Sequence, residues 1–196
     1  MTRQSGYEHI YYYVLQGHLN ILADERDKKI LLDIVLGIQH TDNFKLYAFC
    51  ITNETVCLLL GGAGRTMINT GIRKVIAGFA AHRVKGKQMP KTLRAEEQLS
   101  VTEKRTIRLE PDIKDRCREI HLLPVKKGYV TNIRDYWWSS YRTYLGYYNW
   151  NQVDCSLILR MFDDDRETAV KQFRKFHESA SLDASSDHIN VSSKRL

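Results

Sequence analysis

Two adjacent stretches of the sequence, 45-KLYAFCIT-52 and 54-ETVCLLLGG-62, decide the fold. Both are rich in apolar, aromatic and β-branched residues, which favour extended strands. Only Asn53 separates them, so the connection is too short for anything but a turn. The two stretches therefore predict an antiparallel hairpin, and the other predicted strands and helices lie on either side of it in the sequence.

The residues before the hairpin predict one more strand and a helix. The segment EHIYYYVLQ (8–16) is rich in tyrosine and valine, which is typical of a strand. Asp24 offers a helix cap, and acidic residues follow in the first turn, where the helix dipole favours them. The apolar residues after this cap recur at helical spacing, at Ile30, Leu31, Ile34, Val35 and Ile38.

The residues after the hairpin predict a second helix, a fourth strand and a third helix. Apolar residues recur at helical spacing as far as Val84, and a polar, basic loop follows. The segment KRTIRLE (104–110) alternates as a strand does. A helix then starts at Pro111 or Asp112. Pro124 limits its continuation, because proline cannot donate a backbone hydrogen bond inside a helix.

The predicted order of strand, helix, strand, strand, helix and strand is that of a ferredoxin-like α+β sandwich, an antiparallel sheet with helices on one face. Further helices are added at the C-terminal side, among them an amphipathic helix over 163–178. We therefore divide the chain into an α+β domain (1–130), a helical extension packed on it (131–178) and a serine-rich tail (179–196) that we expect to be disordered.

Composition places the chain among globular proteins, with 196 residues, of which 43% are hydrophobic and 27% charged. No stretch approaches the roughly 18 apolar residues that span a bilayer, and the N-terminus lacks the apolar core of a signal peptide. We expect no membrane partner and a cytoplasmic location. The cysteines form no CxxC pair, which favours reduced thiols over a zinc ribbon or a disulfide framework. They are Cys50, Cys57, Cys117 and Cys155.

The positive charge of the chain, +7 in total, gathers in one segment. From residue 65 to residue 94 the sequence holds eight basic residues and no acidic one. Such a run is often a solvated helix face, but lysine and arginine also neutralise phosphates and release counterions. The absence of acidic residues, together with the family resemblance given below, leads us to interpret the run as a DNA-binding surface. Its members are Arg65, Arg73, Lys74, Arg83, Lys85, Lys87, Lys91 and Arg94.

A cluster of aromatic residues allows two interpretations. Its rings could stack on exposed bases, or they could anchor the C-terminal helices to the core. The sequence does not decide between the two. The cluster comprises Tyr136, Trp137, Trp138, Tyr141, Tyr144, Tyr147, Tyr148 and Trp150.

Four strings resemble, in order and spacing, the single-tyrosine HUH transposases, and among these the REP-associated tyrosine transposases of bacteria. They are LYAFCITNETVCLLL (46–60), RCREIHLLPVKKGYV (116–130), DYWWSSYRTYL (135–145) and VDCSLILRMFDDDRETAVKQFRKF (153–176). Together they extend over most of residues 7–178. The resemblance implies the sandwich fold predicted above and DNA as the partner.

The resemblance also implies where catalysis would reside. The family's two metal-binding histidines map to Thr55 and Cys57, its nucleophilic tyrosine to Glu119, and its third metal-binding side chain to Leu123. In the family a divalent metal polarises the scissile phosphate and the tyrosine attacks phosphorus. None of the four residues here matches that chemistry. We therefore expect a degenerate site, no metal or other cofactor, and a protein that is not an enzyme.

The alternative to a chain without metal is a different metal site, formed by Glu54, Cys57 and Glu119, with His121 nearby in sequence. A buried strand cysteine is more often a small hydrophobic residue. Glu119 is expected to pair with an arginine on its own helix, at position 116 or 118.

The function that the sequence favours is DNA binding by a transposase relative that has lost cleavage, acting as a transcriptional or nucleoid-level regulator in the cytoplasm. The DNA could be a hairpin, a single strand or a duplex, and the family includes both monomers and homodimers. One alternative is an active or decaying transposase of palindromic repeat elements. Another is an interaction module whose basic face meets an acidic protein.

Overall fold

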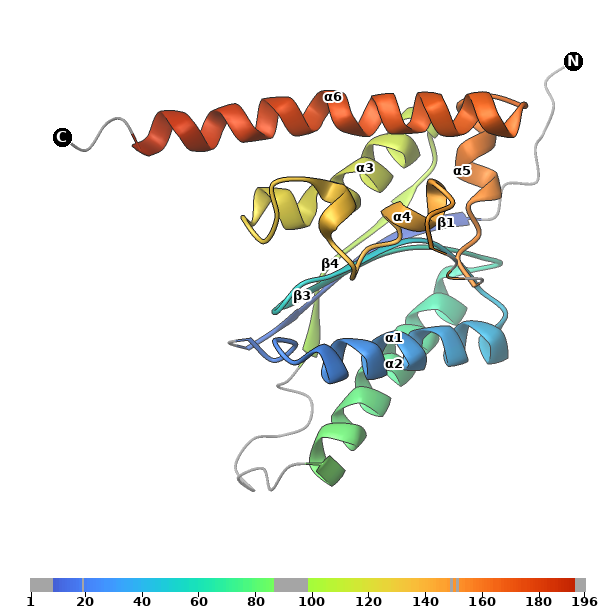
Figure 1. Ribbon diagram of the computed structural model, residues 1–196. Helices are drawn as coiled ribbons and strands as arrows, with labels where there is room; N and C mark the ends of the chain where they lie inside the picture. The colour runs from blue at the N-terminus through green and yellow to red at the C-terminus, as the bar shows by residue number, and fades with distance from the viewer. Residues whose placement is uncertain (1–8, 19, 87–98, 149, 151, 193–196) are drawn as a thin grey trace, which may run out of the picture.

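A computed structural model describes residues 9–18, 20–86, 99–148, 150 and 152–192, and at its centre lies a four-stranded antiparallel sheet (Figure 1). The strands stand in the order β2-β3-β1-β4, with β1 between both of its partners. Tyr12 of β1, for example, pairs with Leu59 on one side and Arg105 on the other. This confirms the predicted α+β class. The strands are β1 (His9–Gly17), β2 (Lys45–Ile51), β3 (Thr55–Gly62) and β4 (Leu99–Ile107).

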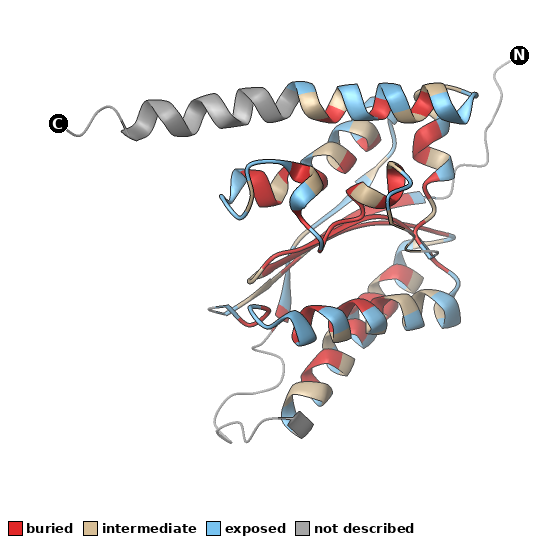
Figure 2. Ribbon diagram, viewed as in Figure 1, coloured by how far each residue is buried: buried red, intermediate tan, exposed pale blue. Residues whose placement is uncertain are grey.

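The predicted hairpin is β2 and β3, which pair antiparallel. The turn is closed by Thr52, whose backbone N–H donates to the carbonyl of Thr55 at 2.8 Å and whose hydroxyl accepts from the Thr55 N–H at 3.1 Å. Nearly every residue of both strands is buried, because helices cover the sheet on both faces (Figure 2). The continuous apolar runs of the sequence are therefore explained by a sheet that helices cover on both faces.

One face of the sheet is covered by α1 (Glu25–Asp42) and α2 (Arg65–Gly86), which pack against each other. Asp24 caps α1 as predicted, since its side chain accepts from the Arg26 N–H at 2.8 Å. Arg83 of α2 donates to the carboxylate of Asp27 and, at 3.2 Å, to the carbonyl of Ile21. Because Asp27 is buried, this ion pair joins α2 to the start of α1 inside the layer.

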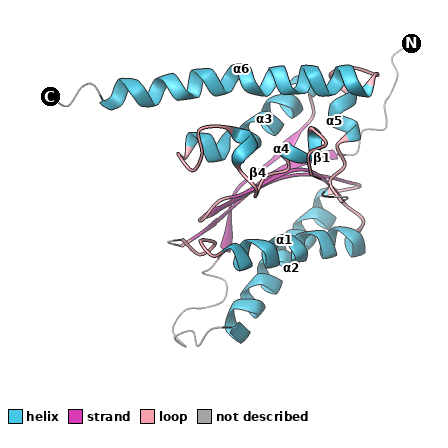
Figure 3. Ribbon diagram, in the orientation of Figure 1, coloured by secondary structure: helices cyan, strands magenta, loops and turns pink. Residues whose placement is uncertain are grey.

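The other face is covered by the C-terminal half of the chain (Figure 3). Helix α3 packs on β2 and β3, and α6 packs on α3. Between them the segment around Ser139 lines the free side of β2, where the Ile51 N–H donates to the carbonyl of Trp138 at 2.9 Å. These elements are α3 (Glu110–Lys126), the short helices η2 (Ile133–Asp135), α4 (Tyr141–Tyr144) and α5 (Ser156–Arg160), and α6 (Arg166–Ser192).

Several predicted boundaries differ from the structure. Strand β4 starts at Leu99 and ends at Ile107, earlier than the expected 104–110, because its pairing with β1 begins opposite Gly17. Pro124 lies inside the last turn of α3, where it removes a single hydrogen bond and the helix ends two residues later. The helix expected over 163–178 is part of α6, whose backbone continues to Ser192, through most of the predicted tail.

No helix among the described residues is both long and apolar enough to cross a lipid bilayer.

We predict that Arg83→Ala lowers the free energy of unfolding by about 3 kcal/mol, because it removes a charged partner from a buried carboxylate. Arg73→Ala, on an exposed face of the same helix, should change it by about 0.5 kcal/mol or less. Urea denaturation followed by circular dichroism measures both values. Equal stability of the two variants would contradict a structural role for the Arg83 pair.

Candidate functional site

The four positions that the resemblance assigns to catalysis lie on β3 and α3. Thr55 is joined to α3 by Lys127, whose ammonium group donates to its hydroxyl oxygen at 3.1 Å, and the same hydroxyl donates to Gln16 at 3.2 Å. Glu119 is about half exposed and pairs with Arg116 at 2.6 Å, as predicted. Leu123 packs against the core. The structure thus brings this part of β3 next to α3, but Glu119 is engaged on its own helix.

Cys57 lies beside a tyrosine and an arginine on the same side of the sheet. The Tyr12 hydroxyl donates to the Cys57 sulfur at 3.8 Å, and the Arg116 guanidinium lies 4.6 Å from the centre of the Tyr12 ring. Burial raises the pKa of the Cys57 thiol to about 11 and raises the pKa of the Tyr12 hydroxyl. Both groups are therefore protonated at neutral pH.

The divalent metal that the family uses does not fit the residues at these positions. Zinc and similar ions bind anionic or imidazole donors, and none of these three side chains offers one. The Thr55 hydroxyl already accepts from an ammonium group, the Cys57 thiol is protonated, and the Leu123 side chain has no donor atom. Lys127 and Arg116 add positive charge on the same side. We therefore derive no catalytic step through a metal at Thr55, Cys57 and Leu123.

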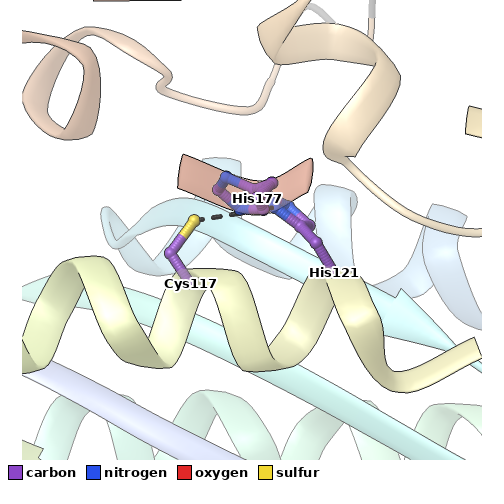
Figure 4. Close-up of side chains that lie close together, drawn as sticks. All are labelled: Cys117, His121 and His177. Carbon is purple, nitrogen blue, oxygen red and sulfur yellow. Dashed lines mark hydrogen bonds between the residues drawn. The ribbon is translucent and has the colours of Figure 1, made fainter. Parts of the chain in front are cut away.

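A second cluster, buried between α3 and α6, unites Cys117, His121 and His177 (Figure 4). Nδ1 of His121 lies 3.0 Å from Nε2 of His177 and 3.8 Å from the sulfur of Cys117. Burial lowers the pKa of both imidazoles, that of His177 to about 3, so both are neutral at pH 7. A thiol and two neutral imidazoles are the donor types that hold a borderline-soft metal ion.

Sequence reasoning missed this cluster for two reasons. It treated Cys117 only as a core residue and placed His121 with Glu54, Cys57 and Glu119, which lie elsewhere. It did not single out His177, which is 56 residues from His121 in sequence. The available signal was the helical spacing of Cys117 and His121, four residues apart, which puts both on one face of α3.

The basic segment is divided between structural and exposed side chains. Lys74 pairs with Asp42 at 2.7 Å, and Arg83 pairs with Asp27, so both stabilise the α1 and α2 layer. Arg65 is exposed at the start of α2. For Lys85 only the backbone, in α2, is described, and Lys87, Lys91 and Arg94 lie outside the described residues.

Arg73 lies at a hollow of about 240 Å³ between α2 and the edge of the sheet. Lys104 of β4 faces it across this hollow, and Tyr13 and Asn69 contribute a hydrogen bond of 2.7 Å between their side chains. Among the residues that the structure describes, no acidic side chain lines it, and Arg73 and Lys104 are both exposed. The hollow is thus a cationic groove, which we call the α2–β4 groove.

The aromatic cluster serves mainly as packing. The Tyr136 and Tyr144 hydroxyls each donate at 2.8 Å to carbonyls of β2, those of Ile51 and Tyr47. The Trp138 indole donates to Glu25 of α1. Trp137 differs, since it is 42% exposed and carries Arg142 over its ring at 5.1 Å. Most rings therefore anchor the C-terminal segment, and few remain to contact bases.

Comparison with known proteins identifies the class to which this fold belongs. No protein-family profile and no curated protein matches the sequence. Among solved structures, a REP-associated tyrosine transposase bound to a REP hairpin is similar, with 16% identity and a TM-score of 0.58 over 76% of this chain and 89% of that one. A proposed transposase from Deinococcus radiodurans aligns at 19% identity and a TM-score of 0.40, over 56% of this chain and 86% of that one.

The fold is therefore similar to that of a REP-associated tyrosine transposase, the family that the four sequence strings also resemble.

The prediction that the chain is not an enzyme is wrong. The solved structure that shares its fold is of a transposase, which is an enzyme. The expected loss of function rested on mapping sequence strings onto Thr55, Cys57, Glu119 and Leu123, and nothing in the structure shows that these replace catalytic residues. The described residues also include a cluster between α3 and α6 that could bind a metal ion, formed by Cys117, His121 and His177.

We predict that Ser140→Ala lowers the free energy of unfolding by about 1 to 3 kcal/mol. The Ser140 hydroxyl accepts from the Phe49 N–H at 3.0 Å and bonds His121 Nε2 at 2.7 Å, so its loss leaves two buried polar groups without this partner. Ser139→Ala is the matched control, because the equally buried Ser139 makes one side-chain bond, of 3.3 Å, to the Tyr141 N–H. Thermal or urea unfolding compares them. A Ser139 variant as unstable as the Ser140 variant would contradict the prediction.

Proposed function

We propose that the protein binds DNA that contains a hairpin or a single-stranded segment, and that the α2–β4 groove holds its phosphates. The observation that carries this proposal is the pair of exposed cations, Arg73 and Lys104, in a groove whose described lining residues include no acidic side chain. A phosphate placed there would meet positive charge without breaking an ion pair.

The surroundings of the groove favour anions as well. Helix α2 starts nearby with Arg65 and has no acidic residue in its first turn, so the positive end of its dipole is not neutralised. Strand β4 is an edge strand with mostly exposed side chains. Because side chains alternate along a strand, Lys104 points to the α2 side and Arg105 to the α3 side. A DNA strand that crosses this edge would meet Lys104 on the α2 side, whereas Arg105 on the α3 side is paired with Glu103.

The α3 side of the sheet is less suited to hold phosphate. Its arginines already have acidic partners, with Arg116 bound to Glu119 at 2.6 Å and Arg118 to Asp115 at 2.8 Å. Arg105 likewise pairs with Glu103 at 2.6 Å. A phosphate would have to displace each carboxylate, so the net gain in free energy would be small.

The shared fold supports the choice of DNA, because the similar REP-associated transposase was solved with a REP hairpin. For this chain we propose the same class of ligand, on the strength of the cations described above and the net charge of +7.

We predict that replacing Arg73 and Lys104 together with alanine lowers the affinity for a labelled DNA hairpin. The plot of log affinity against log salt, whose slope is negative, should also become less steep, by about 0.9 per lost duplex contact or about 0.7 per lost single-stranded contact. The matched control is Lys29→Ala with Lys171→Ala, which removes the same charge from exposed, ion-paired lysines elsewhere. Titrations at several salt concentrations measure both quantities. Equal slopes for the two double variants would contradict a phosphate site in the groove, and an absence of DNA binding would favour an acidic protein partner.

We further propose that the protein occupies chromosomal DNA in the cytoplasm and acts there as a regulator of transcription or of nucleoid organisation. DNA strand transfer is a second candidate function, favoured by the transposase fold itself. Crosslinking followed by sequencing of the bound DNA separates them. We expect discrete peaks at promoters; peaks confined to palindromic repeats would favour strand transfer, and no peaks would contradict both.

A further inference from the structure

The cluster of Cys117, His121 and His177 has the geometry of a metal site (Figure 4). Its donor atoms all lie within 4.8 Å of one another, with separations of 3.0 Å from nitrogen to nitrogen and 3.8 Å from His121 nitrogen to sulfur. Around a tetrahedral zinc ion with bonds of about 2.0 and 2.3 Å, the corresponding separations are roughly 3.4 and 3.6 Å. For these two pairs a shift of a few tenths of an ångström would give the separations of the bound ion, and the third pair, the Cys117 sulfur and the His177 nitrogen, lies within 4.8 Å.

In each imidazole the ring nitrogen that faces away from the cluster is hydrogen-bonded, as is usual for metal-ligating histidines. Nδ1 of His177 donates to the carbonyl of Phe173 at 2.8 Å, which leaves Nε2 free of a proton and directed into the cluster. Nε2 of His121 lies 2.7 Å from the Ser140 hydroxyl, which can accept its proton and leave Nδ1 as a ligand atom. The Ser140 hydroxyl proton then turns to the Phe49 carbonyl, 3.4 Å away.

Without a metal ion, the ring nitrogens of both histidines also have hydrogen-bond partners. There the Ser140 hydroxyl donates to Nε2 of His121, and Nδ1 of His121 donates to Nε2 of His177. Burial raises the pKa of the Cys117 thiol, so that thiol keeps its proton. The two forms differ by one thiol proton, which metal binding would release to solvent. The imidazoles stay neutral in both forms.

We propose that Cys117, His121 and His177 bind one zinc ion, which fastens α6 to α3. One thiolate and two imidazoles match the ligand preference of zinc, whereas magnesium and calcium prefer oxygen donors. The three residues are fully buried beneath the rings of Tyr144 and Phe173, so the ion is closed off from substrate and its role is structural. This site is separate from Thr55, Cys57 and Leu123, where a metal does not fit.

Elemental analysis of untagged protein tests the proposal. We expect about one zinc per chain, and we expect chelation to lower the melting temperature until zinc is restored. Cobalt in place of zinc should give the visible bands of a tetrahedral ion and a thiolate charge-transfer band in the near ultraviolet. Protein that takes up neither metal under reducing conditions would overturn the proposal.

Variants identify the ligands. Cys117→Ser and His177→Gln should each lose stoichiometric zinc, and Cys117→Ser should lose the thiolate band. Cys57→Ser is the matched control, a buried cysteine on β3 outside the cluster, and should keep both zinc and the band. Loss of metal in the Cys57 variant alone would place the ion elsewhere and overturn the assignment. If the cluster variants do not fold, the cobalt spectrum of the unaltered protein decides, because a spectrum without a thiolate band contradicts Cys117 as a ligand.

Discussion

A chain of hydrogen bonds through the core holds the C-terminal layer on the sheet. It runs from the backbone of Phe49 in β2 to the Ser140 hydroxyl, and from there through His121 of α3 to His177 and the Phe173 carbonyl of α6. Every group in it is buried, so each would be costly to leave unpaired. The position of α6 on α3, and of both on β2, thus depends on one polar path through an otherwise apolar layer.

The same arrangement decides which part of the sheet can meet a partner. Helices bury both faces of β2 and β3, and the segment around Ser139 pairs with the outer side of β2. Strand β4 lacks comparable cover, since most of its side chains are exposed. An exposed edge strand invites unwanted pairing with other chains, and charged side chains such as Lys104 and Arg105 counter this tendency. Of these two charges, Lys104 is also the one that a phosphate in the α2–β4 groove would contact.

Local patterns in the sequence predicted most of the elements, whereas the site depended on contacts between distant segments. Apolar runs and helical spacing gave the hairpin, α1 and α2, because those signals arise within a few residues. No local pattern showed that His177 would meet His121, or that Lys104 would face Arg73, since each pair is joined only by the tertiary fold. Helix α3 continues only two residues beyond Pro124, as the limit that proline sets on a helix predicts, because a proline in the last turn removes only one hydrogen bond.

The basic segment illustrates why a count of charges overstates a binding surface. Arg73 and Lys74 are neighbours on α2, yet Lys74 lies 2.7 Å from the carboxylate of Asp42, while Arg73 borders a groove with no acidic side chain among its described lining residues. Asp42 ends α1, so the difference arises from helix packing and not from α2 itself. Where a carboxylate is within reach, a cation contributes to stability and must be released before it can bind phosphate. Where the described residues place none, its charge is available to a partner. Of the four basic side chains of the run that are described, Lys74 and Arg83 are ion-paired, whereas Arg73 borders a groove that a lysine from another strand completes.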